Sequence, residues 1–363
     1  MENILNTLIS IVEFILALGF IILLHEFGHF IIGRLTKIEV EEFGIGFPPR
    51  AIKLFTWKGT LFTLNWIPFG GFCRFKGEDD PLAAGGLSAA NKWARLATLL
   101  GGPVMNLILA SLLFAIVISQ FGMPQYNVAE IMEVIPGSPA AIAGFSNGDI
   151  LTEINGQKIT SVDQIISTTQ QNLGKEMDLT ISRKGKEISL AITPRLNPPA
   201  GQGAMGVVLG NPILPVNFFQ AFPSGVQSTF QMGKQLLMLP VMFVQGQVDS
   251  SQVRLLSPKG IYDIYSQVRT ASEQANNFDP KAVFLNLVSF FAIISAALGF
   301  SNLLPIPAVD GGRIFFLIPE ILFNKRVPAK FENAVHAIGF TILLAIMALV
   351  FIQDFINPVI LPK

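Results

Sequence analysis

Residues 4–33 read ILNTLISIVEFILALGFIILLHEFGHFIIG, and this stretch decides the class of the protein. From Ile4 to Leu24 it is predominantly apolar over 21 residues, with Glu13 as its one charge. A helix of that length is ~31 Å long and can cross the hydrocarbon core of a bilayer. No Lys or Arg precedes the stretch and no small-residue cleavage site follows it, so a retained membrane helix is favoured over a signal peptide.

The composition of the whole chain also indicates a membrane protein. Hydrophobic residues make up 51% of the 363 positions and charged residues only 14%, against roughly 25% in soluble domains. Lys plus Arg equals Asp plus Glu at 25 each, so no basic surface for nucleic acid is expected. The single cysteine, Cys73, excludes a disulfide scaffold and a cysteine-based zinc cage.

Three further segments are long and apolar enough to span a bilayer, and they cover about residues 94–121, 282–304 and 334–355. Residues 314–323 are too short to span alone and are expected to continue the third segment after a break at Pro305 and Pro307. Residues 227–244 are interrupted by polar side chains and are expected to form an interfacial helix. The chain is therefore predicted to be a polytopic α-helical membrane protein with about four transmembrane helices.

The basic residues of the loops predict the orientation. They concentrate in the loop after the first helix and in the short loop before the last one, whereas the amino-terminal tail has none. These residues are Arg34, Lys37, Arg50, Lys53, Lys58, Arg74, Lys76 and Lys92, followed by Lys325, Arg326 and Lys330. The positive-inside rule places both loops in the cytoplasm, and both termini and the long segment between the second and third helices outside.

The first loop carries a β-like pattern. Residues 51–57 and 60–66 alternate apolar and polar side chains around Lys58-Gly59, which predicts a β-hairpin. Residues 67–72, IPFGGF, are too apolar for a solvated loop, so the hairpin is expected to be membrane-associated and to dip into the membrane. Leu64, on the expected strand edge, and Gly70 and Gly71, in the dipping segment, are therefore candidate substrate-binding residues.

Residues 127–196 are more polar, with short β-like runs and the turn signal Asn155-Gly156. They predict a small inserted α+β domain. The run PGSPAAIAGFSNGDILTEINGQKI (residues 136–159) resembles a PDZ domain of the bacterial protease-associated type. Such domains bind extended peptides or carboxyl termini by strand addition. A spacer module without peptide binding is the alternative.

Four regions follow from these patterns: residues 1–126, the PDZ-like domain 127–196, a linker region 197–280, and 281–363 with the last two membrane helices. Within the linker region, residues 201–206 fit the pattern GxGxxG. They follow no strand and open no helix, so the pattern is interpreted as a chance match rather than a dinucleotide site.

The sharpest chemical signal is His25-Glu26-x-x-His29 inside the first apolar helix. Residues i and i+4 share one helix face, so both imidazoles can reach one metal ion, and Glu26 can act on water beside it. This is the arrangement of zinc metalloproteases. Ionisable residues within a membrane segment are costly and are therefore functional by default. The alternative is a polar cluster that packs the helix bundle.

A catalytic zinc needs a third protein ligand. Cys73 and His336 are candidates, but Cys73 lies beside Arg74 and His336 is expected near the membrane boundary. Asp310 is favoured because it lies in the apolar, Pro- and Gly-containing segment NLLPIPAVDGG, residues 302–312. The competing interpretation makes Asp310 the N-cap of a following helix, and both roles can coexist.

The motifs HEFGH, IPFGGFCRFKGED, GGPVMN and NLLPIPAVDGGR, in this order around the PDZ-like segment, resemble the site-2 protease family of intramembrane zinc metalloproteases. The resemblance covers nearly the whole chain and is closer to bacterial members with a single PDZ domain. One departure is LSPKGI at residues 256–261, where the family often has Gly-Pro-Val-Gly-Ile.

The resemblance implies that His25, His29 and Asp310 bind Zn²⁺ and that Glu26 is the general base. It also implies that Asn302 and Gly311 belong to a motif whose asparagine contacts the substrate or the transition state.

The implied function is intramembrane proteolysis in the bacterial inner membrane, with HExxH near the cytoplasmic side. The implied partners are single-span membrane proteins, for example anti-sigma factors or remnant signal peptides, screened outside by the PDZ-like domain. A metal transporter is a rival, but it would need several intramembrane ionisable groups, and only Glu13 is available. A PDZ-bearing scaffold with an inactive metal site is a third interpretation, against which the intact Glu26 argues.

Overall fold

The structure is a computed structural model that describes residues 2–78, 80–125, 128–247, 254–275 and 279–360. The chain divides into two units, one made of residues 1–117 and 222–363 and the other of residues 118–221. The second unit is inserted into the first, as predicted for the small α+β domain. The predicted domain boundary between residues 126 and 127 lies outside the described residues.

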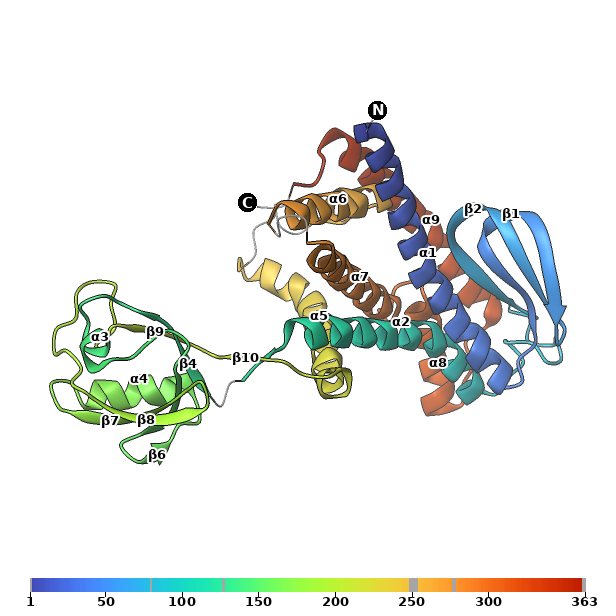
Figure 1. The fold of residues 1–363 in the computed structure, drawn as a ribbon. Coiled ribbons are helices and arrows are strands. Elements are labelled where there is room, and N and C mark those ends of the chain that lie inside the picture. The colour runs from blue at the N-terminus through green and yellow to red at the C-terminus, as the bar shows by residue number, and fades with distance from the viewer. Residues whose placement is uncertain (1, 79, 126–127, 248–253, 276–278, 361–363) are drawn as a thin grey trace. The chain divides into compact units, whose positions relative to one another are not determined.

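The first unit is mainly helical (Figure 1). Within the described residues, four helices are long and apolar enough to cross a membrane, namely α1 (Glu2–Leu35), α2 (Lys92–Phe121), α7 (Pro280–Asn302) and α9 (Ala329–Ile356). The predicted number of membrane helices is therefore confirmed, and the chain is a multi-pass membrane protein. The other helices of this unit are α5 (Phe218–Val244), which includes the segment predicted as interfacial, α6 (Pro258–Ala275) and α8 (Asp310–Phe323).

Helix α1 continues past residue 24 to Leu35, so the HExxH motif lies inside the first helix, as predicted. His25 and His29 therefore lie inside one continuous helix. Two glycines let α2 approach this part of α1 closely, because a Cβ atom on Gly28 would lie 2.2 Å from the carbonyl oxygen of Gly101. The two helices consequently pack backbone to backbone beside the histidines.

The predicted hairpin consists of β1 (Val40–Trp57) and β2 (Thr60–Phe75), and it packs against α1 (Figure 1). Lys58 and Gly59 form the turn with φ values of 47° and 88°, as a two-residue hairpin turn of type I′ requires. Phe30 of α1 contacts the rings of Phe43 and Phe62, and this aromatic contact joins the sheet to the helix that carries the histidines.

The pairing is more complex than a simple hairpin. Residues 42–45 of β1 have partners in two parts of β2, residues 61–64 and residues 71–74. Leu64 pairs with both Ile45 and Ile52, so its backbone is occupied on both sides. The expectation that Leu64 belongs to an edge strand is therefore wrong. Residues 71–74 pair only with residues 42–45 among the described strands and form the edge instead.

The second unit is an α+β domain, as predicted. Its main sheet has the strand order β8-β7-β5-β4-β9, with β6 paired to β5, and a separate two-stranded sheet joins β3 to β10. The strands are β3 (Met123–Pro124), β4 (Ala129–Val134), β5 (Ile150–Ile154), β6 (Gln157–Lys158), β7 (Met177–Arg183), β8 (Lys186–Ile192), β9 (Val207–Gly210) and β10 (Ile213–Leu214). The helices are α3 (Pro139–Ala143) and α4 (Val162–Gln171). Ile131, Leu151, Ile165 and Ile181 are among the buried residues of its core.

The domain extends beyond its predicted end at residue 196. Strand β9 pairs with β4, and the segment before it is tied to the domain by hydrogen bonds from the N–H of Arg195 to the carbonyl of Ala204 and from the N–H of Ala140 to that of Met205. Residues 201–206 are consequently part of this domain and not a linker. They lead into a strand rather than a helix, which agrees with the interpretation of GxGxxG as a chance match.

Candidate metal centre

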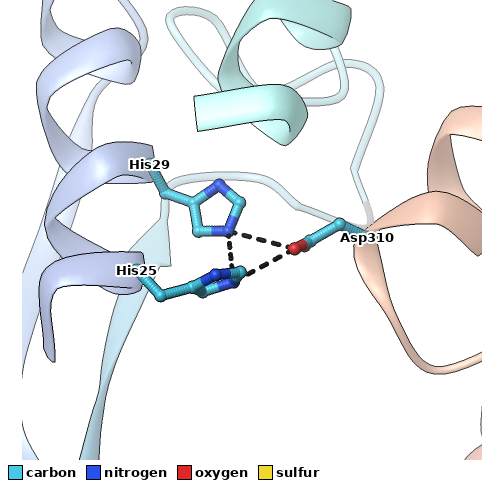
Figure 2. A group of neighbouring side chains, drawn as sticks. All are labelled: His25, His29 and Asp310. Atoms are coloured by element: carbon cyan, nitrogen blue, oxygen red, sulfur yellow. Dashed lines mark hydrogen bonds and ion pairs between the residues drawn. The ribbon is translucent and has the colours of Figure 1, made fainter. Parts of the chain in front are cut away.

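The helical period of α1 brings two imidazoles together. His25 and His29 are one turn apart, both are buried, and their Nε2 atoms lie 3.2 Å from each other (Figure 2). The Nδ1 atom of His29 lies 2.8 Å from the carbonyl oxygen of Thr98 on α2. A carbonyl only accepts, so Nδ1 of His29 carries the proton, and in the neutral ring the lone pair of Nε2 faces His25.

Asp310 completes the group from the other end of the chain. Helix α7 ends at Asn302, and the segment with Pro305 and Pro307 separates it from α8, whose first residue is Asp310. Asp310 Oδ2 lies 3.1 Å from Nε2 of His25 and 3.3 Å from Nε2 of His29 (Figure 2). Val309 occupies the N-cap position of α8. The interpretation of Asp310 as the N-cap is therefore wrong, and its side chain faces the histidines.

The far end of α8 is fixed to α2. Arg95 Nη1 lies 2.8 Å from Oε2 of Glu320, and Lys92 Nζ donates to the carbonyl oxygen of Glu320 at 3.1 Å. At the near end, Ala308 has a φ of 84°, a conformation that favours glycine. Its N–H donates to Nδ1 of His336 on α9 at 3.0 Å. These contacts hold the segment that presents Asp310.

The three ligand atoms fit a tetrahedral zinc ion. Two ligands each about 2.1 Å from a tetrahedral Zn²⁺ lie about 3.4 Å apart, and the separations here are 3.1, 3.2 and 3.3 Å. Three electron-rich atoms at such distances repel one another unless a cation or a proton lies among them. Within the described residues, His25, His29 and Asp310 are the group of this kind, and it contains neither Cys73 nor His336.

Gly102 on α2 leaves space beside the Nε2 atoms of His25 and His29. A Cβ atom on Gly102 would lie 2.3 Å from Nε2 of His29 and 2.7 Å from Nε2 of His25. Both distances are far below van der Waals contact, so a larger residue would displace the two ligand atoms. The donor atoms, their separations and this space together fit the metal that the sequence predicts.

Glu26 lies beside the ligands and outside their group. Its Oε2 atom accepts the backbone N–H of Cys73 at 3.0 Å, which ties the predicted base to the edge of the sheet. A polar cavity of about 290 Å³ is lined by Glu26, the three ligand residues and Asn302, together with Glu78 and Arg313. The structure therefore brings the predicted base, the predicted ligands and Asn302 to one cavity.

The remaining candidate substrate residues lie outside the lining of this cavity. Gly311, Gly70, Gly71 and Leu64 are not among the residues that line this cavity. A Cβ on Gly311 would lie 2.2 Å from the carbonyl oxygen of Leu304, so this glycine allows α8 to begin against the preceding backbone. A Cβ on Gly71 would lie 3.9 Å from Cγ of Glu26, which places this part of the strand edge next to the base.

Sequence reasoning did not identify the contribution of α2. Thr98, Gly102 and Asn106 are spaced four residues apart and face the two histidines, which have the same spacing on α1. The motif GGPVMN contains two of these residues, and their common helix face was the available signal. Glu78 and Arg313 carried no comparable signal.

Glu13, the other ionisable residue of α1 considered for transport, is already paired. Its carboxylate accepts from the hydroxyl of Tyr265 at 3.0 Å and forms an ion pair with Arg269, both on α6. Burial, together with this hydrogen bond, raises the pKa of Tyr265 to about 12, so the hydroxyl remains a donor. Glu13 therefore attaches α6 to α1, and it lends no support to a transport path.

Comparison with known proteins agrees with this centre. A relative from Clostridium acetobutylicum, whose name assigns it provisionally to the zinc metalloproteases, is 31% identical over 357 residues, which are 96% of this chain and 98% of the relative. The zinc metalloprotease RasP of Oceanobacillus iheyensis is 27% identical, over 95% of this chain and 98% of its own. A solved PDZ domain from a Listeria monocytogenes protein is 24% identical and covers 23% of this chain and 88% of its own, with a TM-score of 0.21.

The family comparison covers most of the molecule. The sequence profile described as peptidase family M50 matches residues 13–346, a range that contains His25, Glu26, His29 and Asp310 as well as the inserted domain. The chain therefore belongs to peptidase family M50, the site-2 protease family of zinc metalloproteases that its motifs resemble.

Proposed function

We propose that this protein is an intramembrane zinc endopeptidase that cleaves membrane-spanning segments of other proteins. The observation that carries the proposal is the convergence of His25, His29 and Asp310 within 4.8 Å, with two of these ligands on a candidate membrane span. Glu26 and Asn302 share the same cavity. Its substrates would be single-span membrane proteins, for example anti-sigma factors or remnant signal peptides.

Each group in the cavity has a chemical role in peptide hydrolysis. Zinc, when bound by the three ligands, supplies a Lewis acid that polarises a carbonyl and lowers the pKa of water toward about 7. Glu26 accepts the proton of the attacking water and returns it to the leaving amine. The Asn302 side chain can donate a hydrogen bond to the oxygen on which negative charge develops.

The sheet edge explains how a helix could be presented for cleavage. Helical carbonyls are held in i to i−4 hydrogen bonds, so a substrate must unwind locally, and unwinding in lipid leaves costly unsatisfied backbone groups. Residues 71–74 form a strand edge, and the N–H of Cys73 on that edge contacts Glu26. Pairing of an unwound substrate with this edge would satisfy its backbone beside the base.

The inserted domain offers a second contact for the substrate. A groove of about 350 Å³ lies between α4 and β9 and is lined by apolar residues that include Ile166, Leu173, Met205 and Val207. Strand β9 is at one end of the sheet order, so an extended peptide can add to it. We assign this groove to a segment of the substrate outside the membrane, in a bacterial inner membrane with the domain outside and HExxH toward the cytoplasm.

The test combines metal analysis with cleavage of a single-span substrate by the purified full-length protein. The wild type should bind one zinc and cleave the substrate. Glu26→Gln should retain zinc, because Glu26 is not a ligand, but lose cleavage by at least about 100-fold, the usual contribution of general base catalysis. Glu187→Gln changes an exposed glutamate of the inserted domain and should match the wild type. Near-normal cleavage by Glu26→Gln would overturn the proposed mechanism.

A further inference from the structure

The face of α2 that meets the histidines supports them at two points. The carbonyl of Thr98 accepts the Nδ1–H of His29 at 2.8 Å, and this contact leaves Nε2 of His29 free to face Asp310. Two turns further along α2, the side-chain amide of Asn106 lies next to the Nδ1 atom of His25, which is the same ring position that the Thr98 carbonyl contacts in His29. Because α2 and α1 run in opposite directions here, the earlier residue of α2 supports the later histidine.

The hydrogen bonding of the buried Asn106 side chain is incomplete. Its side chain is 1% exposed, and its Nδ2 atom lies 3.4 Å from Nδ1 of His25. Its Oδ1 atom is buried and has no hydrogen-bond partner among the described residues. A buried amide oxygen without a partner is unfavourable, so an explanation is required.

The chemistry of His25 supplies that explanation. If Nε2 of His25 binds the metal, the single proton of the neutral ring resides on Nδ1, which then needs an acceptor. The two ends of a carboxamide are nearly isosteric, and a half-turn of the Asn106 amide about Cβ–Cγ exchanges Oδ1 and Nδ2. In that orientation Oδ1 accepts the Nδ1–H of His25, and Nδ2 takes the buried place that Oδ1 has in the present orientation. The exchange is favoured because the Nδ1–H of a metal-bound His25 needs an acceptor.

From this geometry we infer that Asn106 is a positioning residue of the metal centre: its side-chain oxygen holds the His25 tautomer whose Nε2 lone pair faces the metal. The inference rests on the proposed function, because it presupposes that His25 is a ligand. Partners of this kind orient metal-bound histidines and raise their basicity. Asn106 does not contact the substrate in this assignment.

Asn106 itself is held firmly. The hydroxyl of Ser295 on α7 donates to the backbone carbonyl of Asn106 at 2.8 Å. One turn away, a Cβ on Gly299 would lie 3.1 Å from the carbonyl oxygen of Pro103, so α7 and α2 are in close contact around this residue. The amide can therefore act as a fixed acceptor.

The experiment measures zinc affinity of the purified full-length protein by competition with a chromophoric chelator, so its readout does not depend on cleavage. Asn106→Leu keeps the branched shape of the side chain and removes the acceptor, and it should weaken zinc binding about 10- to 100-fold. Asn106→Asp restores an acceptor at the same place and should bind zinc at least as tightly as the wild type. Ser111→Ala, which removes a buried hydroxyl on α2 that bonds to the Leu107 carbonyl and the Thr229 hydroxyl, should have the wild-type affinity.

The outcomes separate this inference from the proposed function. A wild type without stoichiometric zinc would overturn the metal centre itself. A wild type that binds zinc, with Asn106→Leu equally tight, would overturn only the role of Asn106. If Asn106→Leu fails to fold, the zinc affinity of Asn106→Asp decides the question. A zinc affinity of Asn106→Asp as low as that of a variant lacking a proposed ligand, such as Asp310→Ala, would contradict the acceptor role. The absorption spectrum of the cobalt-substituted proteins gives a second readout, because loss of the tautomer-fixing bond should change the ligand geometry at His25.

Discussion

At the scale of single residues, the candidate metal centre depends on the lack of a side chain at Gly102 as well as on the side chains of His25, His29 and Asp310. The three ligand atoms approach one another at 3.1–3.3 Å, and this is possible only because Gly102 has no side chain beside them. A glycine inside a helix costs about 1 kcal/mol relative to alanine. Its presence at this point of α2 is therefore explained by the space that the ligands need.

Replacing Gly102 with alanine should weaken zinc binding even though alanine favours the helix. The added Cβ would lie 2.3 Å from a ligand atom of His29, so we expect zinc affinity to fall by at least about 10-fold. The matched control is Gly101→Ala. Its Cβ would meet the carbonyl of Gly28 rather than a ligand, so it should lower the thermal stability while the folded protein still binds zinc. Wild-type zinc affinity in Gly102→Ala would contradict this account.

The zinc content of alanine variants distinguishes Asp310, a proposed ligand, from His336, which is not one. Asp310→Ala removes one of the three proposed ligands and should lose most of the bound zinc. His336→Ala removes the acceptor of the Ala308 N–H and the ring contact with Phe316 but no proposed ligand, so stoichiometric zinc should remain, with a stability loss of about 1 kcal/mol. Zinc content and thermal unfolding of the two purified variants provide the measurement. Full zinc in Asp310→Ala would exclude this residue as a ligand.

At the scale of structural elements, the buried carboxylate of Asp149 in the inserted domain links the start of β5 to β7 and to the loop at Ser146. Asp149, which precedes β5, is 1% exposed and accepts two hydrogen bonds of 2.7 Å from Arg183 of β7. The N–H of Ser146 donates to the same carboxylate at 2.8 Å. Burial raises the pKa of Asp149, but the hydrogen bonds from Arg183 and Ser146 outweigh it and lower the pKa below its ordinary value.

This lowered pKa predicts an acid-dependent loss of stability in the inserted domain. The unfolded carboxyl has a pKa of about 3.9, and the folded one lies lower, so the contribution is complete above pH 4 to 5 and is lost as the pH falls through the folded pKa. Asp149→Asn should cost about 2–3 kcal/mol at pH 7 and flatten the pH dependence. Hydrogen exchange of the domain in the full-length protein, corrected for intrinsic rates, measures both effects. An unchanged acid profile in Asp149→Asn would assign the dependence to other groups.

At the scale of the whole molecule, the sequence predicted those features whose chemistry is local. HExxH on an apolar helix and Asp310 in a Pro- and Gly-rich break permit few other interpretations, and the structure brings these residues together. The hairpin turn at Lys58-Gly59 was predicted for the same reason, because two residues determine it.

Features that depend on distant pairing were missed. Leu64 was placed on an edge because no local signal shows that residues 61–64 and 71–74 both pair with residues 42–45. The domain end at residue 196 was too early because β9 pairs with β4, more than 70 residues earlier in the chain. The roles of Asn106 and Gly102 depend on the packing of α2 against α1, which no local sequence pattern specifies.

The orientation of the molecule in its membrane is still a prediction. The four candidate spans determine which connecting segments would lie on the same side of the membrane. Four crossings require the α1–α2 loop and the α8–α9 loop to lie on one side and the inserted domain on the other. These two loops are the ones that carry the concentrated Lys and Arg residues, so two independent segments agree on a cytoplasmic side. Long segments translocate largely regardless of charge, so the basic residues of the inserted domain do not oppose this orientation.

Cysteine labelling can test this orientation cleanly because Cys73 is the single cysteine of the chain. In a Cys73→Ser background, Lys184→Cys places a thiol on the exposed β7–β8 turn, and Lys325→Cys places one in the exposed loop before α9. A membrane-impermeant maleimide applied to intact spheroplasts should label Lys184→Cys at once and Lys325→Cys only after lysis, while the background remains unlabelled. The opposite pattern would invert the topology and place the inserted domain in the cytoplasm, where it could not screen the outer segments of substrates.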